Sequence, residues 1–310
     1  MTNPFAIAIH GGAGTIRRQS LAPAQEAALL AGLNAALDAG LTVLSSGGSA
    51  LDAVEVAVMV LEDDPLFNAG HGAVFNDQGF IELEAAIMDG RQRNAGSVSG
   101  VQRVRNPVRL ARAVMERTPH ITLGFAAADA YAEQIGLPLA DASYFFTQSR
   151  WDALQTELAR LATGGAAEDA SEQTRHGTVG AVALDRSGKL AAATSTGGRT
   201  AKMAGRIGDT PIIGAGTWAD ELLAVSGTGH GETFVRCVAA HEVASRVRYM
   251  GQPLADACDE VVFGNLVELG GTGGLIAVDW EGHIAMPFNC EGMYRAAVDA
   301  SGIRTVAIYR

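Results

Sequence analysis

A pair of apolar strands at the centre of the chain limits the possible folds more than any other feature of the sequence. Residues 176–185 (HGTVGAVALD) and 190–196 (LAAATST) are separated by the turn sequence Asp185-Arg186-Ser187-Gly188. Two such runs joined by a short glycine-containing turn are typical of a β-hairpin. The hairpin follows residues 162–175 (ATGGAAEDASEQTR), which are small, polar and without periodicity, so we interpret that segment as a linker.

The other predicted elements surround this hairpin with further strands and helices. Strands are expected at residues 5–9, 80–88, 96–101, 224–226, 274–279, 283–287 and 305–309. Helices are expected at residues 23–39, 49–63, 107–117, 124–136, 151–161, 232–250 and 254–266, with Gly40 ending the first and a glycine-rich turn at 10–14. Because strands and helices do not alternate regularly, we expect stacked antiparallel sheets covered by helices, an α+β fold.

Charge and cysteine content exclude several classes of protein. The formal net charge is −11 and no basic cluster is found, so neither nucleic acid nor an anionic membrane is expected as a partner. Three cysteines without a C-x-x-C pair argue against a disulfide framework or a cysteine-based zinc site and fit a cytoplasmic protein. No secretory signal is expected, and the apolar run 51–61 contains two acidic residues and is too short to span a bilayer.

Several common catalytic and binding motifs are missing from the sequence. Gly188-Lys189 is followed by leucine, which excludes a phosphate loop, and no serine has glycine on both sides at a distance of two. His241-Glu242 does not continue into H-E-x-x-H. Residues 227–231 (GTGHG) have the wrong glycine spacing for a dinucleotide site, although a nest of backbone amides for a small anion remains an alternative.

The remaining candidates for chemistry are threonines beside glycines, Thr178, Thr196 and Thr228. A threonine in a strand is usually no more than a good β-former. Thr178 differs because it lies between the linker and the apolar strand. If the peptide bond before it were cut, its new α-amine, with a pKa of about 7.7–8.0, could take the proton of its own hydroxyl near neutral pH. One residue would then supply both nucleophile and base.

The sequence around this threonine, residues 176–182 (HGTVGAV), resembles the plant-type L-asparaginase and isoaspartyl peptidase family of N-terminal-nucleophile (Ntn) hydrolases. The resemblance extends over nearly the whole chain. Its further motifs are residues 9–14 (IHGGAG), 65–70 (PLFNAG), 193–198 (ATSTGG), 205–211 (GRIGDTP), 270–274 (GGTGG) and 287–293 (PFNCEGM). A single Gly-Thr pair is uninformative, whereas this ordered set is specific.

The resemblance implies a four-layer αββα sandwich of the Ntn-hydrolase type, formed by residues 1–310 as a single domain. The precursor would cleave itself between Gly177 and Thr178. Residues 1–177 would become an α subunit that ends in a flexible linker, about 162–177, and residues 178–310 a β subunit. The mature protein would self-associate as (αβ)2.

The resemblance also assigns site residues for the hydrolysis of L-asparagine and β-aspartyl dipeptides. It implies that Thr178 is the nucleophile and forms an acyl-enzyme. The other assigned residues are Thr196, which holds the nucleophile; Asn68, which hydrogen-bonds near it; Thr228 and Gly229, the oxyanion donors; Arg206, for the substrate carboxylate; and Asp209, for the substrate ammonium. An Arg-x-x-Asp outside this context is usually a surface ion pair. Arg206 and Asp209 together would form a substrate clamp. Glutamine has one methylene more than asparagine, which would displace its reacting carbonyl relative to this clamp, so we expect no useful glutaminase activity.

No cofactor is implied for catalysis, but the resemblance implies a structural Na⁺ in the loop that follows the second predicted helix. Its ligands would be the main-chain carbonyls of Leu61, Glu62, Asp64, Phe67, Ala69 and His71. Carbonyl ligands leave little trace in side-chain types, and the same residues are also typical of a helix end followed by a turn that starts with proline.

Three departures and three alternatives accompany the resemblance. His230 replaces a threonine found in many relatives, which could change the substrate preference and the pH profile. Glu84 replaces an aspartate, which could change local packing. Arg175 and His176 precede the expected cleavage point and could change the rate of maturation. Glycosylasparaginase and a threonine aspartase-like endopeptidase share the nucleophile and are the alternative enzymes. An inactive binding protein on the same fold is the non-enzymatic alternative, against which the presence of the complete residue set argues.

Overall fold

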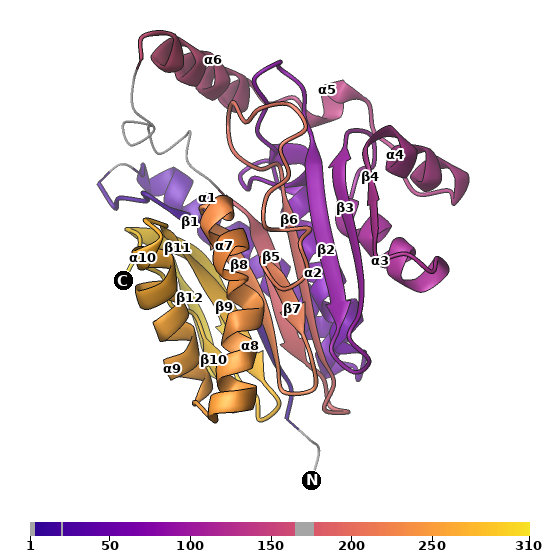
Figure 1. The fold of residues 1–310 in the computed structure, drawn as a ribbon, viewed down its shortest axis with the longest axis vertical. Helices are drawn as coiled ribbons and strands as arrows, with labels where there is room; N and C mark the ends of the chain where they lie inside the picture. The colour runs from indigo at the N-terminus through magenta and orange to yellow at the C-terminus, as the bar shows by residue number, and fades with distance from the viewer. Residues whose placement is uncertain (1–3, 20, 165–176) are drawn as a thin grey trace.

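The computed structural model describes residues 4–19, 21–164 and 177–310 and places their strands in two sheets (Figure 1). The large sheet consists, in spatial order, of β12 (Arg304–Ala307), β11 (Gly292–Val298), β1 (Ala6–Gly14), β5 (Val179–Leu184), β6 (Leu190–Thr196), β2 (Leu83–Asp89), β3 (Asn94–Val101) and β4 (Thr122–Gly124). The small sheet consists of β10 (Ile284–Ala285), β9 (Gly273–Asp279), β8 (Leu223–Gly229) and β7 (Thr217–Ala219). Neighbouring strands are antiparallel except β3 and β4.

Helices cover the outer faces of both sheets. The helices of the described residues are α1 (Pro23–Ser45), α2 (Ala50–Asp63), α3 (Pro107–Arg117), α4 (Phe125–Gln134), α5 (Ala142–Phe145), α6 (Gln148–Ala162), α7 (Gly231–Cys237), α8 (Ala239–Met250), α9 (Leu254–Asp259) and α10 (Leu266–Glu268), with the short helices η1 (Gly70–Gly72) and η4 (Glu260–Asn265). Helices α1, α2 and α3 pack on the large sheet, and α8 and α9 pack on the small sheet, where Figure 1 draws them in orange.

Strand β1 is apolar on both faces because it lies between two cores. Its isoleucines, Ile7 and Ile9, pack with the helices on the outer face, and its alanines, Ala6 and Ala8, pack against the small sheet. Side chains in a strand point alternately to the two faces, so one apolar strand can serve both cores. A third apolar core lies between the small sheet and helices α8 and α9. The expected pair of antiparallel sheets covered by helices is confirmed in this mixed α/β architecture.

The large sheet interleaves strands from the two sides of Gly177. Strand β1 pairs with β5 on one side and with β11 on the other, and both partners follow Gly177 in the sequence. Strands β2 and β6, which also come from opposite sides of Gly177, pair with each other. Thr178, which directly precedes β5, is therefore held among strands from both sides of Gly177.

Most predicted elements are present, and two predictions about glycines in the N-terminal half are wrong. The first helix does not end at Gly40 but continues to Ser45. A Cβ at Gly40 would lie 2.4 Å from Ile7 Cδ1 and 3.1 Å from the carbonyl oxygen of Ala53, so this glycine allows close helix packing and is not a stop signal. The glycine-rich stretch 10–14 is not a turn but the end of β1, with a shift of register between residues 10 and 12.

Further differences concern the C-terminal half. The helix predicted at 232–250 is divided into α7 and α8 at Val238, whose φ of 50° is left-handed. Strand β11 was not predicted, because residues 292–298 (GMYRAAV) contain glycine and arginine and do not form a continuous apolar run. The strand predicted at 283–287 is reduced to the two residues of β10. Most of the predicted linker, residues 165–175, and His176 lie outside the described residues.

Helix α1 has the length and apolar composition of a helix that could cross a membrane. Its residues Leu29, Leu33 and Leu37 are buried, and the helix packs against α2 and the large sheet. The core helix of a soluble protein passes the same test of length and composition. One such helix is therefore no evidence of a membrane protein.

Candidate active site

Strand pairing brings the predicted nucleophile next to a second threonine. Thr178 directly precedes β5, Thr196 is the last residue of β6, and Val179 pairs with Ser195. The hydroxyl of Thr178 donates a hydrogen bond to Oγ1 of Thr196 at 3.2 Å, and both side chains are buried. The two predicted residues therefore meet because the hairpin places the start of one strand beside the end of the other.

The carbonyl oxygen of Gly177 accepts two hydrogen bonds. Asn68 Nδ2 donates at 2.7 Å and the Thr196 hydroxyl donates at 3.1 Å. The backbone N–H of Gly198 donates to Thr196 Oγ1 at 2.9 Å, so the acceptor side of that hydroxyl is also engaged. Two donors on one carbonyl oxygen can stabilise the negative charge that develops there when the carbonyl carbon is attacked.

The amide of Asn68 is held at both ends, in the loop that follows α2. Its Nδ2 donates to the carbonyl oxygen of Gly198 at 2.7 Å as well as to Gly177, and its Oδ1 accepts from the N–H of Val74 at 3.0 Å. These partners determine which end of the amide is the donor. Asn68 is thus rigidly directed at the peptide bond before Thr178.

Glycines of β1 leave space for this peptide bond. A Cβ at Gly12 would lie 2.9 Å from Gly177 Cα and 3.4 Å from the backbone nitrogen of Thr178, and Gly12 has a φ of +117°, which favours glycine. A Cβ at Gly11 would lie 2.4 Å from the ring of Phe67. The backbone of β1 therefore approaches the candidate cleavage point more closely than a residue with a side chain could.

His10 is a buried group beside the nucleophile that the sequence did not single out. Its Nε2 is 2.8 Å from the hydroxyl oxygen of Ser226. Burial lowers the pKa of His10 to about 3, and the backbone of Thr178 offsets this in part. The imidazole is therefore neutral at neutral pH and acts as a hydrogen-bonding group. The available signal was a histidine inside an apolar strand, next to paired glycines.

Thr228 and Gly229, the predicted oxyanion donors, form the end of β8. The Thr228 hydroxyl oxygen accepts a hydrogen bond from the N–H of Ala13 at 3.2 Å, and Ala13 follows the glycine that contacts Thr178. Gly229 has a φ of +149°, and a Cβ there would lie 2.4 Å from the carbonyl oxygen of Thr272. The end of β1 thus joins this pair to the surroundings of Thr178.

Arg206 and Asp209 converge on the residue that begins α7. A Cβ at Gly231 would lie 2.7 Å from Arg206 Nη2 and 2.7 Å from Asp209 Oδ1. Gly231 comes two residues after Gly229, so the predicted substrate clamp lies beside the predicted oxyanion donors. The two parts are brought together by β8 and the loop that follows β6.

Asp209 is a buried carboxyl group with an unsatisfied oxygen. Its side chain is almost fully buried, and Oδ2 has no hydrogen-bond partner among the described residues. Burial raises the pKa of Asp209 to about 7, although the positive charge of Arg206 acts in the opposite direction. A buried carboxylate without a partner is costly, so a cation that binds beside it gains a strong interaction.

Glu232 links the clamp to His230. Arg206 Nε donates to Glu232 Oε1 at 3.0 Å, and His230 Nε2 lies 3.4 Å from Glu232 Oε2. Partial burial alone would raise the pKa of Glu232, but the hydrogen bond and charge of Arg206 prevail and lower it to about 2. Sequence reasoning did not single out Glu232; its position in the first turn of α7, close to Thr228 and Gly229, was the available signal.

Glu84 holds the loop between Arg206 and Asp209. Both of its carboxylate oxygens lie 3.1 Å from the N–H of Gly208, which donates to them. The buried Lys202 lies 3.9 Å from Glu84 Oε1 and donates to the carbonyl oxygen of Glu82 at 2.9 Å. Burial raises the pKa of Glu84, with the charge of Lys202 acting against it. Glu84 therefore does more than pack locally, because it fixes the backbone that carries the clamp.

Backbone carbonyls of the predicted Na⁺ loop crowd the turn at η1. A Cβ at Gly70 would lie 2.4 Å from the carbonyl oxygen of Glu62, and a Cβ at Gly72 would lie 2.1 Å from that of Phe67. The Glu62 side chain points to β6, where its Oε1 accepts from the Ser195 hydroxyl at 2.7 Å. Its Oε1 is thus engaged by β6, whereas its Oε2 has no hydrogen-bond partner among the described residues. The remaining predicted ligands are the carbonyls of Leu61 in α2, Asp64, Ala69 and His71 in η1.

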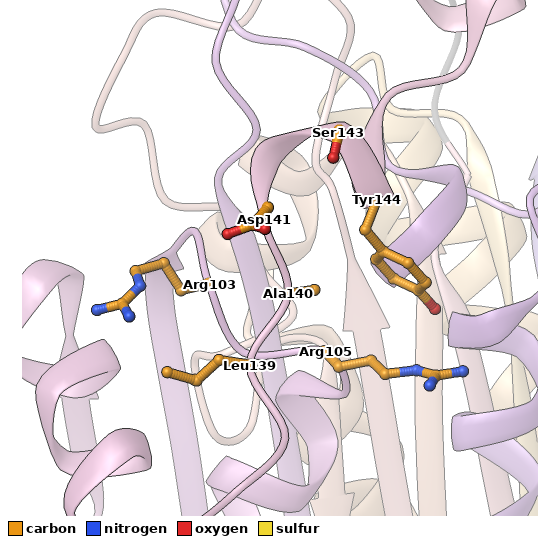
Figure 2. A pocket seen from close by; sticks show the side chains of 7 residues that line it. All are labelled: Arg103, Arg105, Leu139, Ala140, Asp141, Ser143 and Tyr144. Carbon is orange, nitrogen blue, oxygen red and sulfur yellow. The ribbon is translucent and has the colours of Figure 1, made fainter.

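A pocket of about 420 Å³ at α5 is separate from this site (Figure 2). Figure 2 shows the side chains of Arg103 and Arg105 pointing in opposite directions, and each is paired with a carboxylate, Glu133 and Asp63 respectively. The donors do not converge on a ligand. Buried Asp279 and exposed Glu281 and His283 form a second cluster at the turn between β9 and β10, where the described residues give no further indication of a metal.

The sequence is similar to known proteins over nearly the whole chain. The family model described as Asparaginase matches residues 3–308. The chain is 48% identical to an isoaspartyl peptidase of Salmonella typhimurium, with 99% of each chain covered, and 48% identical to an isoaspartyl peptidase of Escherichia coli, with 98% of this chain and 96% of the relative covered. It is 40% identical to a probable isoaspartyl peptidase/L-asparaginase of Arabidopsis thaliana, with 98% of this chain and 99% of the relative covered.

Proposed function

This chain belongs to the asparaginase family and is a hydrolase, and we propose that it hydrolyses L-asparagine and β-aspartyl dipeptides with Thr178 as its nucleophile. The observation that carries the assignment of the nucleophile is the contact between the Thr178 hydroxyl, the Thr196 hydroxyl and the Gly177 carbonyl. The buried cluster joins a nucleophile to a carbonyl group that is already polarised by two donors.

The first reaction is cleavage of the chain itself. Thr178 Oγ1 attacks the carbonyl carbon of Gly177, and Asn68 and Thr196 stabilise the developing oxyanion. The C–N bond breaks as the acyl group moves from nitrogen to oxygen, and the Thr178 nitrogen gains a proton. Water then hydrolyses the ester, which yields a carboxylate at Gly177 and a free amine at Thr178.

The new amine makes Thr178 a catalyst for other substrates. Its pKa of about 7.7–8.0 lets it accept the hydroxyl proton as Oγ1 attacks a side-chain carbonyl. The Thr228 hydroxyl and the Gly229 N–H stabilise the oxyanion, and the loss of one such donor typically lowers the rate about 100- to 1000-fold. The leaving ammonia or amino acid takes the proton, and water hydrolyses the acyl-enzyme to release aspartate.

Arg206 and Asp209 hold the aspartyl part of the substrate. The guanidinium suits a forked contact with the α-carboxylate, and the unsatisfied, buried Oδ2 of Asp209 suits the α-ammonium. Both charges are fixed to one loop that Glu84 holds, so the distance from the clamp to the reacting carbonyl is set. The added methylene of glutamine would displace that carbonyl, and glutamine is therefore a poor substrate.

The maturation and assembly proposed here follow from the same cleavage. The single domain 1–310 would become subunits 1–177 and 178–310 in a four-layer αββα sandwich, and two such pairs would associate as (αβ)2. Exposed apolar side chains in the clamp loop, Met203, Ile207 and Ile212, support association. The low cysteine content supports a cytoplasmic location.

We also propose a structural Na⁺ in the loop at η1. The carbonyl oxygens of Glu62 and Phe67 already lie close to this turn, and oxygen donors of this kind suit a hard cation. The carbonyls of Leu61, Glu62, Asp64, Phe67, Ala69 and His71 would hold the ion. When bound, it would stabilise the loop that carries Asn68, and catalysis itself needs no cofactor.

Substitution of the nucleophile tests the proposal. The purified protein should give two bands on a denaturing gel, of roughly 18 and 14 kDa as shares of the 32.1 kDa chain. Thr178→Ala should remain a single chain and hydrolyse neither L-asparagine nor β-Asp-Leu, whereas Thr178→Ser should retain cleavage and part of the activity. Hydrolysis by Thr178→Ala would show that another group is the nucleophile. Preferred turnover of glycosylated asparagine or of a protein substrate would favour the alternative enzymes.

A further inference from the structure

We propose that a small pocket beside Gly229 binds the amino acid that leaves from a β-aspartyl dipeptide, and that Arg17 pairs with the α-carboxylate of that amino acid. This inference rests on the proposed function. The pocket has a volume of about 220 Å³ and is lined by Ala13, Gly14, Gly229 and Cys290, with Arg17 and Glu291 among its other lining residues.

The pocket lies on the path that the substrate must follow past the nucleophile. Along β1, a Cβ on Gly12 would lie 2.9 Å from Gly177 Cα and 3.4 Å from the nitrogen of Thr178, the N–H of Ala13 donates to Thr228 Oγ1, and Gly14 lines the pocket. Three consecutive residues thus lead from the nucleophile, past the oxyanion donor, to the pocket.

The end of β8 and the start of α7 show the same order from the other end of the substrate. A Cβ on Gly231 would lie 2.7 Å from both Arg206 Nη2 and Asp209 Oδ1 of the clamp, whereas Gly229 lines the pocket. A dipeptide whose aspartyl part is held at the clamp and whose carbonyl lies at the oxyanion donors therefore has its leaving amino acid directed to the pocket. The ammonia that leaves from asparagine is too small to reach it.

The size and chemistry of the pocket fit one amino acid. Its volume is below the roughly 300–1,000 Å³ of sites for larger ligands, so a longer peptide would extend into solvent. Alanine, glycine and the half-buried thiol of Cys290 provide uncharged walls that accept an apolar side chain. The pocket therefore favours a free amino acid with a neutral side chain as the leaving group.

Arg17 supplies the positive charge for a carboxylate. Its Nε donates to both carboxylate oxygens of Glu291, at 3.1 and 3.0 Å, and 65% of the Arg17 side chain and 44% of the Glu291 side chain are exposed. Exposed ion pairs contribute little in water. The guanidinium can therefore change partners at low cost and make a forked contact with a substrate carboxylate, while Glu291 disfavours leaving groups with acidic side chains.

The experiment compares three substrates in the mature enzyme: β-Asp-Leu, its C-terminal amide and L-asparagine. Arg17→Gln should lower kcat/KM for β-Asp-Leu about tenfold more than for L-asparagine, because a hydrogen-bonded charge partner of the carboxylate is lost. The amide lacks that carboxylate, so its kcat/KM should fall no more than that of asparagine. Arg17→Lys should recover part of the difference.

Arg18→Gln is the matched control, since Arg18 is the next residue, carries the same charge and stacks over Tyr309 at 4.7 Å. It should not change the ratio between the substrates. Equal effects of Arg17→Gln on all three substrates, or an unchanged ratio, would overturn the proposal. If the unsubstituted enzyme hydrolyses none of the three, the proposed function is wrong and this inference falls with it; that outcome is visible before any variant is compared.

Discussion

Replacement of Asp209 by asparagine should remove binding of the substrate ammonium and, at the same time, stabilise the protein at neutral pH. The reason is that Asp209 is buried and its Oδ2 lacks a partner among the described residues. Asparagine has nearly the same shape but carries no charge. The effect on stability should therefore depend on pH in a way that the structure predicts.

The size of the effect follows from the pKa of Asp209, which burial raises from 3.8 to about 7. A carboxyl group with a raised pKa in the folded state loses stability as the pH rises from the unfolded pKa to the folded pKa. Each pKa unit corresponds to about 1.4 kcal/mol, so ionised Asp209 reduces the free energy of unfolding by about 4 kcal/mol above pH 7. Of this, about 2 kcal/mol develops between pH 5 and pH 7, where folded Asp209 is half ionised.

The assay is thermal unfolding between pH 5 and pH 8, in a Thr178→Ala background that keeps the chain intact. With an unfolding entropy of about 2.1 cal/mol/K per residue, about 2 kcal/mol over a chain of 310 residues corresponds to a Tm change of about 3 °C. The Tm of the Asp209→Asn variant minus that of its parent should increase by this amount from pH 5 to pH 7 and then remain constant.

Asp299→Asn serves as a control without pH dependence in this range. Hydrogen bonds with Ser301 and Ile303 lower the pKa of Asp299 from its ordinary value of 3.8, so this carboxylate stabilises the fold fully at every pH of the assay. Its replacement should therefore lower the Tm by the same amount at pH 5 and at pH 7. A Tm difference for Asp209→Asn that stays constant, or decreases, from pH 5 to pH 7 would refute the reasoning. In the mature enzyme, Asp209→Asn should raise KM for L-asparagine at least about thirtyfold.

Two further predictions concern the surroundings of the clamp and of the cleavage point. Glu84→Gln removes a negative charge that helps to raise the pKa of Asp209, so this pKa should fall. The pH below which KM for L-asparagine increases should therefore be lower in the variant. A KM–pH profile that is unchanged or shifted to higher pH would contradict this. Gly12→Ala should slow self-cleavage more than about tenfold on time-resolved gels, because its Cβ would lie 2.9 Å from Gly177 Cα. Gly47→Ala is the control, because Gly47 also has a positive φ but open space around it. Backbone strain should lower the free energy of unfolding of both variants by about 1–2 kcal/mol, and only Gly12→Ala should delay cleavage.

Local patterns predicted the elements that depend on local interactions. Helix α2 is capped by Ser49, whose side chain accepts a hydrogen bond from the N–H of Asp52. Its apolar residues repeat with helical spacing, so its bounds could be predicted closely. The boundaries that failed depend on tertiary contacts. Gly40 does not end α1, because it packs against Ile7, and Val238 interrupts a helix without glycine or proline to mark the break.

The candidate site divides in the same way. Thr178 and Thr196 could be predicted to meet, because they occupy adjacent strands of one hairpin. Two other contacts could not be predicted, because their residues are more than a hundred positions apart in the sequence. They are the hydrogen bonds of His10 with Ser226 and of Glu84 with Gly208. Neither contact has a periodic or motif signal, since each depends on the order of strands in the sheets.

The alternation of strands from the two sides of Gly177 constrains the order of folding and of the proposed self-cleavage. Strand β1 is hydrogen-bonded on both edges to strands that follow Gly177, so we expect this part of the sheet to form before the proposed cleavage. The two proposed fragments would then separate only if the hydrogen bonds in the middle of the sheet broke, and separated fragments would have to reassociate in dilute solution. The activity of the mature protein should therefore persist according to how slowly it opens, and a heated sample that has lost its activity should not regain it on cooling.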